Sequence, residues 1–119
     1  MKQHKAHYCF RQEAGSDTHK LYIYDDVTEY GAFDWWTWEY TESETSAEFF
    51  RKTLAEIPEN AVIELHINSY GGSVKEGVAI YNQLKQKKCR EIVAYVDGFA
   101  YSVASVILQA ADRRIMGLG

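Results

Sequence analysis

Two short segments constrain this chain most, because each places small residues between an apolar strand and a helix. Residues 67–74 read INSYGGSV, and residues 97–105 read DGFAYSVAS. Such a junction can direct free backbone N–H groups at a negative charge. The second junction also carries Ser102, and a serine beside an oxyanion-binding turn is half of a serine hydrolase. The sequence offers no equally clear general base.

The pattern around these junctions predicts alternating strands and helices. We expect strands at 21–24, 61–67, 91–96 and 113–116, and helices at 46–57, 74–87 and 101–111. Capping boxes at 45–48 and 73–76 begin the first two helices, and Pro58 ends the first. Because the helices between the strands are short, right-handed parallel crossovers are expected. The fold class is therefore α/β, with a parallel sheet flanked by helices.

The faces of these helices can also be predicted. In the second helix the apolar positions place Val74, Val78, Tyr81 and Leu84 on the buried side. The third helix is small and apolar on nearly every side, which predicts burial all round.

Two regions are harder to assign. Residues 1–20 are polar, with a strand indicated at 7–11 and a turn at 14–17, and one domain follows over 21–119. The aromatic stretch 30–40 is compatible with a loop or with a short strand packed under the sheet.

Composition excludes several classes of function. No run of about eighteen apolar residues exists to span a membrane, and no secretory leader begins the chain, so a cytoplasmic location is expected. The net charge is −4, and residues 21–50 hold eight acidic residues and no Lys or Arg, which argues against nucleic acid. Cys9 and Cys89 are interpreted as reduced thiols rather than as a pair. No metal or nucleotide motif is present, so no cofactor is expected.

Each junction taken alone has a plain structural explanation. Gly71 and Gly72 are compatible with a tight turn that binds nothing. Ser102 and Ser105 are compatible with capping or packing a helix. The two junctions together, at this separation, favour a catalytic interpretation.

The joint pattern closely resembles the Clp protease proteolytic subunit (ClpP) family, especially the ClpP-like proteases of phages and prophages. That family has an Asn-Ser-Pro-Gly-Gly-x-Val turn, followed by a helix with Ala-Ile-Tyr-Asn-x-Leu, matched here by 79–84. A strand ending in Asp-Gly and a small-x-Ser-x-Ala-Ser helix follow, matched by 97–98 and 100–105. The resemblance covers about 21–116 and is strong over 61–112.

The resemblance implies a role for each matching residue. Ser102 would be the nucleophile, Gly72 and Val103 would donate the oxyanion-hole N–H groups, and Gly71 and Tyr70 would line the substrate groove. The implied fold is the ClpP/crotonase stack of β-β-α units, and family members assemble into rings. The implied reaction is peptide-bond hydrolysis through a serine acyl-enzyme.

The sequence departs from the family in two ways. Tyr70 stands where the family usually has a proline, which would fix the turn. The family's histidine lies some twenty-odd residues after its serine and its aspartate later still, whereas this sequence ends seventeen residues after Ser102. We therefore expect a C-terminally incomplete ClpP-like domain, inactive by itself and unable to form a double ring. His66, Lys75 and Lys85 are weak candidates for a substitute base.

Three functions remain open at this point. The first is a Clp-type or phage prohead serine endopeptidase, with a protein or peptide substrate, homo-oligomers, and an ATPase or capsid and scaffold partner. The second is a non-enzymatic, truncated prophage module that binds peptide or partner subunits. The third is a crotonase-class thioester enzyme, which Ser102 at the nucleophile position disfavours.

Overall fold

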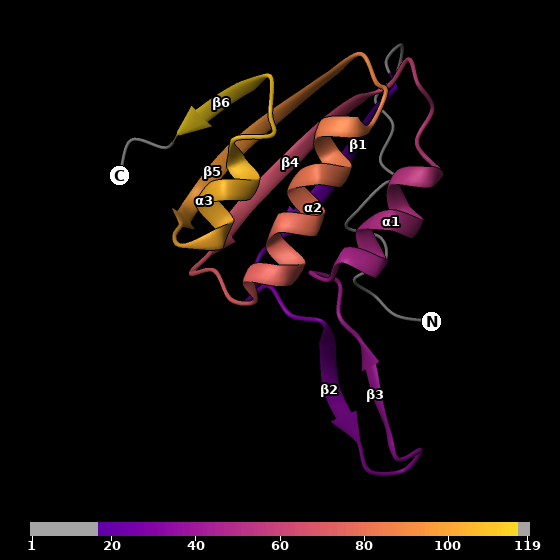
Figure 1. The fold of residues 1–119 in the computed structure, drawn as a ribbon. Helices are drawn as coiled ribbons and strands as arrows, with labels where there is room; N and C mark the ends of the chain where they lie inside the picture. The colour runs from indigo at the N-terminus through magenta and orange to yellow at the C-terminus, as the bar shows by residue number, and fades with distance from the viewer. Residues whose placement is uncertain (1–16, 117–119) are drawn as a thin grey trace.

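The computed structural model describes residues 17–116 and shows an α/β arrangement (Figure 1). The elements, in chain order, are β1 (Thr18–Ile23), β2 (Tyr30–Asp34), β3 (Glu39–Glu42), α1 (Ala47–Ala55), β4 (Val62–Ser69), α2 (Val74–Gln86), β5 (Glu91–Ala100), α3 (Val103–Leu108) and β6 (Arg113–Met116). The strands expected from the alternating pattern are confirmed, and β1 begins earlier than predicted, at Thr18. No helix in this part of the chain is long and apolar enough to cross a membrane.

The main sheet has four parallel strands in the order β1-β4-β5-β6. Leu21 of β1 pairs with Leu65 of β4, which pairs in turn with Ala94 of β5. Because all four strands run the same way, their carboxyl ends meet at one edge of the sheet. Both junctions follow such ends, so the topology brings them together.

The core lies between this sheet and the helices, which cover one face of it in Figure 1. Alternate residues of β4, namely Ile63, Leu65 and Ile67, are completely buried on that face. The intervening side chains of Glu64 and His66 are half-buried on the other face, which we call the open face. The period of two predicted from the sequence is therefore confirmed.

The predicted buried face of α2 is confirmed at Leu84, which is buried, and at Tyr81, which is partly buried against the core, but is wrong at Val74 and Val78. Val74 is 65% exposed and Val78 is 41% exposed, whereas Gly77 and Ile80 are buried. The physical reason is that α2 packs between α1 and α3 rather than only on the sheet. A methyl group on Gly77 would lie 2.2 Å from a methyl carbon of Val103. The close contact between α2 and α3 therefore sets the rotation of α2 about its own axis.

The capping boxes form only in part. Ser73 accepts a hydrogen bond from the backbone N–H of Glu76, as predicted, at 3.2 Å. The Glu76 carboxylate, however, accepts from the backbone N–H of Ala47 at 2.8 Å and so links α2 to the start of α1. The N-cap of α1 is Ser46, not Thr45, whose hydroxyl donates to the carbonyl of Asp26 at 2.6 Å.

Two further expectations need correction. The helix predicted over 101–111 is the shorter α3, and it is buried on one side only, since Val106 and Gln109 are exposed. The aromatic stretch 30–40 does not pack under the sheet. Most of it lies in the antiparallel hairpin of β2 and β3, which projects beyond the lower end of the sheet in Figure 1.

Three predictions cannot be compared in full with the structure, because they concern residues outside the described range. The strand at 7–11 lies there, as does all of the turn at 14–17 except Asp17. Cys9 lies there too, while Cys89 is free. Burial raises the pKa of the Cys89 thiol, and Asp112 raises it further.

Candidate active site

The two junctions predicted from the sequence meet at Ser69, the last residue of β4. Its buried hydroxyl accepts a hydrogen bond from the N–H of Gly71 at 3.1 Å. Its carbonyl accepts one from the N–H of Tyr101 at 3.0 Å. One residue therefore holds the glycine turn and the segment that leads into Ser102.

The glycine turn requires glycine at both positions. Gly71 and Gly72 have φ values of +112° and +137°, a region that side-chain-bearing residues rarely adopt. A Cβ on Gly71 would lie 2.7 Å from the Cβ of Ser102. A Cβ on Gly72 would lie 2.3 Å from the carbonyl oxygen of Val27. The turn is thus pressed against the serine on one side and the chain after β1 on the other.

A short parallel bridge between Val27 and Gly72 fixes the turn. The N–H of Val27 donates to the carbonyl of Gly71 at 2.7 Å, and the N–H of Ser73 donates to the carbonyl of Val27 at 2.7 Å. The bridge uses the neighbours of Gly72, so the Gly72 N–H is not consumed by it. That N–H is the one that the resemblance assigns to the oxyanion hole.

Ser102 is an exposed residue in a strained conformation. Its φ is +54° and its ψ is −130°, and within residues 17–116 only Trp38 shares a positive φ among the non-glycine residues. Such torsions cost roughly 1–3 kcal/mol and are concentrated at functional sites. The carbonyl of Ser102 is held by the hydroxyl of Ser105 at 2.6 Å and by its N–H at 2.9 Å. This strain gives no signal in the sequence.

Val103 is the first residue of α3, and its N–H therefore has no acceptor within the helix. The structure thus brings together the predicted residues Ser102, Gly72 and Val103 around one point. In such an arrangement a hydroxyl can attack a carbonyl carbon, and nearby backbone N–H groups can bind the oxyanion that forms.

An aromatic cluster borders this point. The ring centroids of Tyr70 and Phe99 lie 4.7 Å apart in a stacked arrangement, and Tyr101 lies 5.5 Å and 5.2 Å from them. All three rings are exposed. Tyr70 was predicted to line the groove, but Phe99 and Tyr101 were missed, although they flank Ser102 in the sequence. The cluster forms an exposed apolar surface next to Ser102.

His66 is engaged elsewhere and does not serve Ser102. Its Nδ1 contacts the carboxylate of Asp97 at 2.9 Å and its Nε2 contacts that of Glu64 at 3.3 Å. Both ring nitrogens are therefore occupied, on the open face of the sheet. His66 therefore lies on the face of the sheet opposite to Leu65.

The other described candidates for a base lie too far away or are paired. His19 is level with Ile63 in the sheet, and six residues of strand separate Ile63 from Ser69, about 20 Å. Lys75 lies 3.5 Å from Glu29 and 3.9 Å from Glu76. Lys85 lies near the far end of α2, about 17 Å along the helix axis from its start.

Comparison with known proteins agrees with this geometry. The sequence profile of the Clp protease family matches residues 41–116, which is more than half of the chain. The chain belongs to the Clp protease family. It is 43% identical over 51 residues to the ATP-dependent Clp protease proteolytic subunit of Bdellovibrio bacteriovorus and, over the same length, to subunit 1 of Corynebacterium jeikeium. These alignments cover 43% of this chain and 24% and 27% of the relatives, so the aligned part spans about a quarter of their length.

Solved structures share the Clp protease fold with this chain. The ClpP protease catalytic domain from Plasmodium falciparum has a TM-score of 0.58 at 28% identity, covering 78% of this chain and 43% of that one. A ClpP1 mutant from Listeria monocytogenes also has a TM-score of 0.58, at 24% identity, covering 77% and 46%. The predicted α/β fold class, with its ClpP-like parallel sheet and helices, is thereby confirmed.

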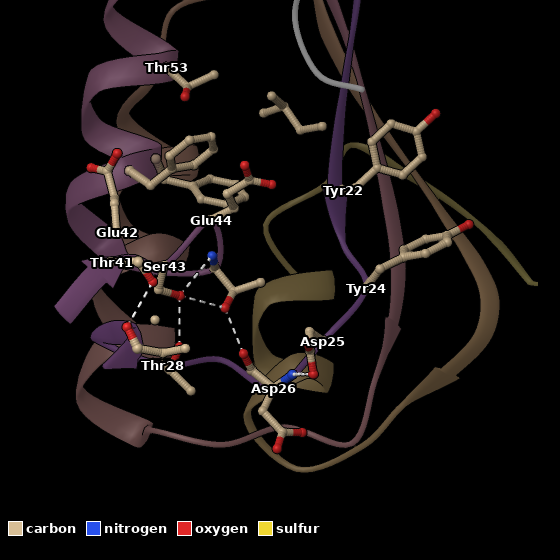
Figure 2. A pocket seen from close by; sticks show the side chains of 16 residues that line it. Tyr22, Tyr24, Asp25, Asp26, Thr28, Thr41, Glu42, Ser43, Glu44 and Thr53 are labelled. Atoms are coloured by element: carbon tan, nitrogen blue, oxygen red, sulfur yellow. Dashed lines mark hydrogen bonds between the residues drawn. The ribbon is translucent and has the colours of Figure 1, made fainter. Parts of the chain in front are cut away.

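A separate pocket does not have Ser102, Gly72 or Val103 among its lining residues. It has a volume of about 900 Å³ and lies between β1, α1 and the base of the β2–β3 hairpin (Figure 2). Hydrogen bonds between side-chain hydroxyl groups line it: the hydroxyl oxygens of Thr28 and Ser43 are 2.7 Å apart, and those of Ser43 and Thr45 are 3.0 Å apart. Together with the bond from Thr45 to Asp26, they fix the chain on either side of Val27, and so support the glycine turn indirectly.

A pH-dependent contact lies on the open face, where the hydroxyl of Tyr24 donates to the carboxylate of Asp97. Burial, this hydrogen bond and the nearby negative charge raise the pKa of Tyr24 from 10.0 to about 12. The folded chain holds this proton more tightly than the unfolded chain. The resulting stability is complete below pH 10 and is lost as the pH rises through about 12.

We therefore expect Tyr24→Phe to flatten the fall in stability between pH 10 and about 12. Urea unfolding of both proteins across this range measures the difference, and absorbance titration of the tyrosines should show one fewer late-titrating phenol. An unchanged alkaline profile in the variant would contradict the assignment.

Proposed function

We propose that this chain supplies the nucleophile and the oxyanion hole of a Clp-type serine endopeptidase. The observation that carries the proposal is the contact between the glycine turn and Ser102, where an exposed hydroxyl is held at positive φ. A turn that only connected a strand to a helix would not need a strained serine against it. Membership of the Clp protease family and the Ala-x-Ser-x-Ala-Ser sequence support the same assignment.

In the proposed reaction, the Oγ of Ser102 attacks the carbonyl carbon of a peptide bond. The N–H groups of Gly72 and Val103 would stabilise the oxyanion by about 3–4 kcal/mol each. The proton of Ser102 passes to a base, the amine leaves with a proton, and water hydrolyses the acyl-enzyme. The exposed rings of Tyr70, Phe99 and Tyr101 would bind apolar side chains of the peptide.

The base in this scheme is not one of the described histidines. His19 lies far along the sheet, and His66 is held by two carboxylates. We therefore propose that residues 17–116 alone react slowly, because a serine without its base loses most of the rate gain of a triad.

The finer assignment to a phage or prophage type is also a proposal. Tyr70 in place of the family's proline and the divergent aromatic and acidic stretch 25–45 favour it. Protein or peptide substrates, homo-oligomers, and an ATPase or capsid and scaffold partner remain part of this proposal.

Chemical rescue tests the proposed roles directly. A fluorophosphonate probe should label the 119-residue chain slowly, and added imidazole should accelerate labelling by about 100-fold if it replaces the missing base. Mass spectrometry should place the adduct on Ser102 rather than on Ser105. Ser102→Ala should remove the labelling with and without imidazole.

Three results would count against parts of the proposal. Equal labelling of Ser102→Ala, or no imidazole-stimulated labelling at all, would exclude Ser102 as the nucleophile. It would favour a non-enzymatic module that binds peptide on its exposed aromatic surface. Rapid labelling without imidazole would show instead that a base is already present.

A further inference from the structure

The β2–β3 hairpin, residues 30–42, is built around its own aromatic rings, and we call it the aromatic arm. Phe33 lies at its centre, with ring centroids 4.8 Å from Trp35, 5.8 Å from Trp38 and 5.1 Å from Tyr40, all edge-to-face. The carboxylate of Asp34 accepts from the N–H of Trp36 at 2.9 Å and shapes the turn. These contacts give the arm a defined shape although it projects away from the sheet (Figure 1).

The tip of the arm exposes more aromatic surface than its own folding requires. Trp36 is 95% exposed and, within residues 17–116, no ring contact involves it. Trp35 and Trp38 are each 71% exposed. Contiguous exposed apolar surface of this kind marks interaction sites, and tryptophan is the residue type most enriched among the side chains that dominate binding energy.

The negative charge of the arm indicates the charge of the surface that it binds. The tip and its flanks carry Asp34, Glu39 and Glu42, and no Lys or Arg occurs over residues 21–50. Among the described residues, no ion pair involves Asp34 or Glu39. Tryptophan faces beside carboxylates bind Lys and Arg side chains, because ring and carboxylate both attract the cation. The partner surface is therefore basic.

The chain itself carries such a surface at the connection from α2 to β5. Lys85, Lys87, Lys88 and Arg90 occur within six residues, and we call this segment the basic end. Three of the four line a cleft of about 450 Å³, which also has apolar walls from Leu84, Ile92 and Ala110. In the described part of the chain, no ion pair involves Lys85, Lys88 or Arg90.

The acidic groups in this cleft are already engaged. Glu91 pairs with Arg113 at 2.7 Å, and the carboxylate of Asp112 accepts from the N–H of Ile92 at 2.8 Å. Outside the cleft, Glu56 and Glu59 precede β4, which starts at the same end of the sheet as β5. The free positive charge is therefore concentrated on the basic end.

The arm and the basic end of one chain cannot meet. In Figure 1 the arm projects from the lower end of the molecule, whereas the connection from α2 to β5 lies at the upper end. We infer that the aromatic arm of one copy docks on the basic end of a second copy, with Trp36 in the cleft and Glu39 beside Arg90 or Lys88. Such a contact joins unlike surfaces, so it closes into a ring or extends as a filament. It does not depend on the role of Ser102.

Charge exchange between two variants tests this contact. Thr37→Lys with Glu39→Lys and Glu42→Lys changes the charge of the arm from −3 to +2, and Lys85→Glu with Lys88→Glu and Arg90→Glu changes that of the basic end from +4 to −2. Each variant alone should lose self-association by at least about tenfold, measured by analytical ultracentrifugation. An equimolar mixture should recover it, because each altered surface now finds a complementary one. Raising the salt concentration from about 0.1 M to about 1 M should weaken association of the wild-type chain.

A second variant separates aromatic from electrostatic binding. Trp36→Ala should weaken association by at least about tenfold, whereas Met116→Ala, at another exposed apolar position, on β6, should not. Circular dichroism checks that each variant keeps its fold. Four results would overturn the inference: a monomeric wild-type chain at low salt, association unaffected by Trp36→Ala, association kept in full by either of the two charge-reversed variants alone, or no recovery in the mixture.

Discussion

Gly72→Ala is expected to destabilise the folded chain by about 3 kcal/mol, because the added methyl group meets backbone rather than a side chain that can rotate. Its position would lie 2.3 Å from the carbonyl oxygen of Val27 and 2.8 Å from the Val27 nitrogen. The φ of +137° adds strain that alanine cannot relieve. Urea unfolding followed by circular dichroism measures the loss.

Gly98→Ala is the matched control for this substitution. A methyl group there would lie 2.4 Å from the side-chain oxygen of Asn68, which can move, and Gly98 does not have a positive φ. We expect a loss of about 1 kcal/mol, mainly from the hydrogen bond between Asn68 and the N–H of Phe99. Equal losses for the two variants would show that Gly72 is not specially constrained.

Ile80→Ala is expected to cost about 3 kcal/mol, since Ile80 is completely buried and its removal leaves a cavity between α2 and its neighbours. Val78→Ala, two residues earlier on the same helix, should cost less than about 1 kcal/mol, because Val78 is partly exposed. The two chemical changes are similar, so the contrast reports the rotation of α2. Thermal and urea unfolding of both variants provide the measurement.

If Val78→Ala cost more stability than Ile80→Ala, the buried face of α2 would instead be the one predicted from the sequence. That prediction counted apolar side chains and therefore placed Val78 inside. It could not include Gly77, whose missing side chain admits Val103, or Glu76, whose carboxylate binds the start of α1. Contacts between helices, rather than the apolar pattern of one helix, decide which face is buried.

The strands and the site differ in how far the sequence predicts them. The alternation along β4 and the glycine pair after it indicate a strand and a turn, because both depend on neighbouring residues. The position of Ser102 against Gly71 depends on two parallel strands ending at one edge, which the element order already implies. The positive φ of Ser102 and the hydrogen bonds of Ser69 are set by tertiary contacts and leave no local pattern.

The packing of the β2–β3 hairpin is another feature that the sequence pattern did not determine. The sequence of residues 30–40 was compatible with a loop or with a short strand packed under the sheet. Here Phe33 is surrounded by rings of the hairpin itself, and the acidic residues between them keep the arm in solvent. Local aromatic packing therefore replaced packing on the sheet.

Ser69 gives the site a single point of support. Its hydroxyl holds the glycine turn, and its carbonyl holds the segment that leads to Ser102. A shift of the end of β4 therefore carries both parts in the same direction and preserves the spacing between them. The glycine turn and Ser102 therefore behave as one mechanical unit, which is either present as a whole or lost as a whole.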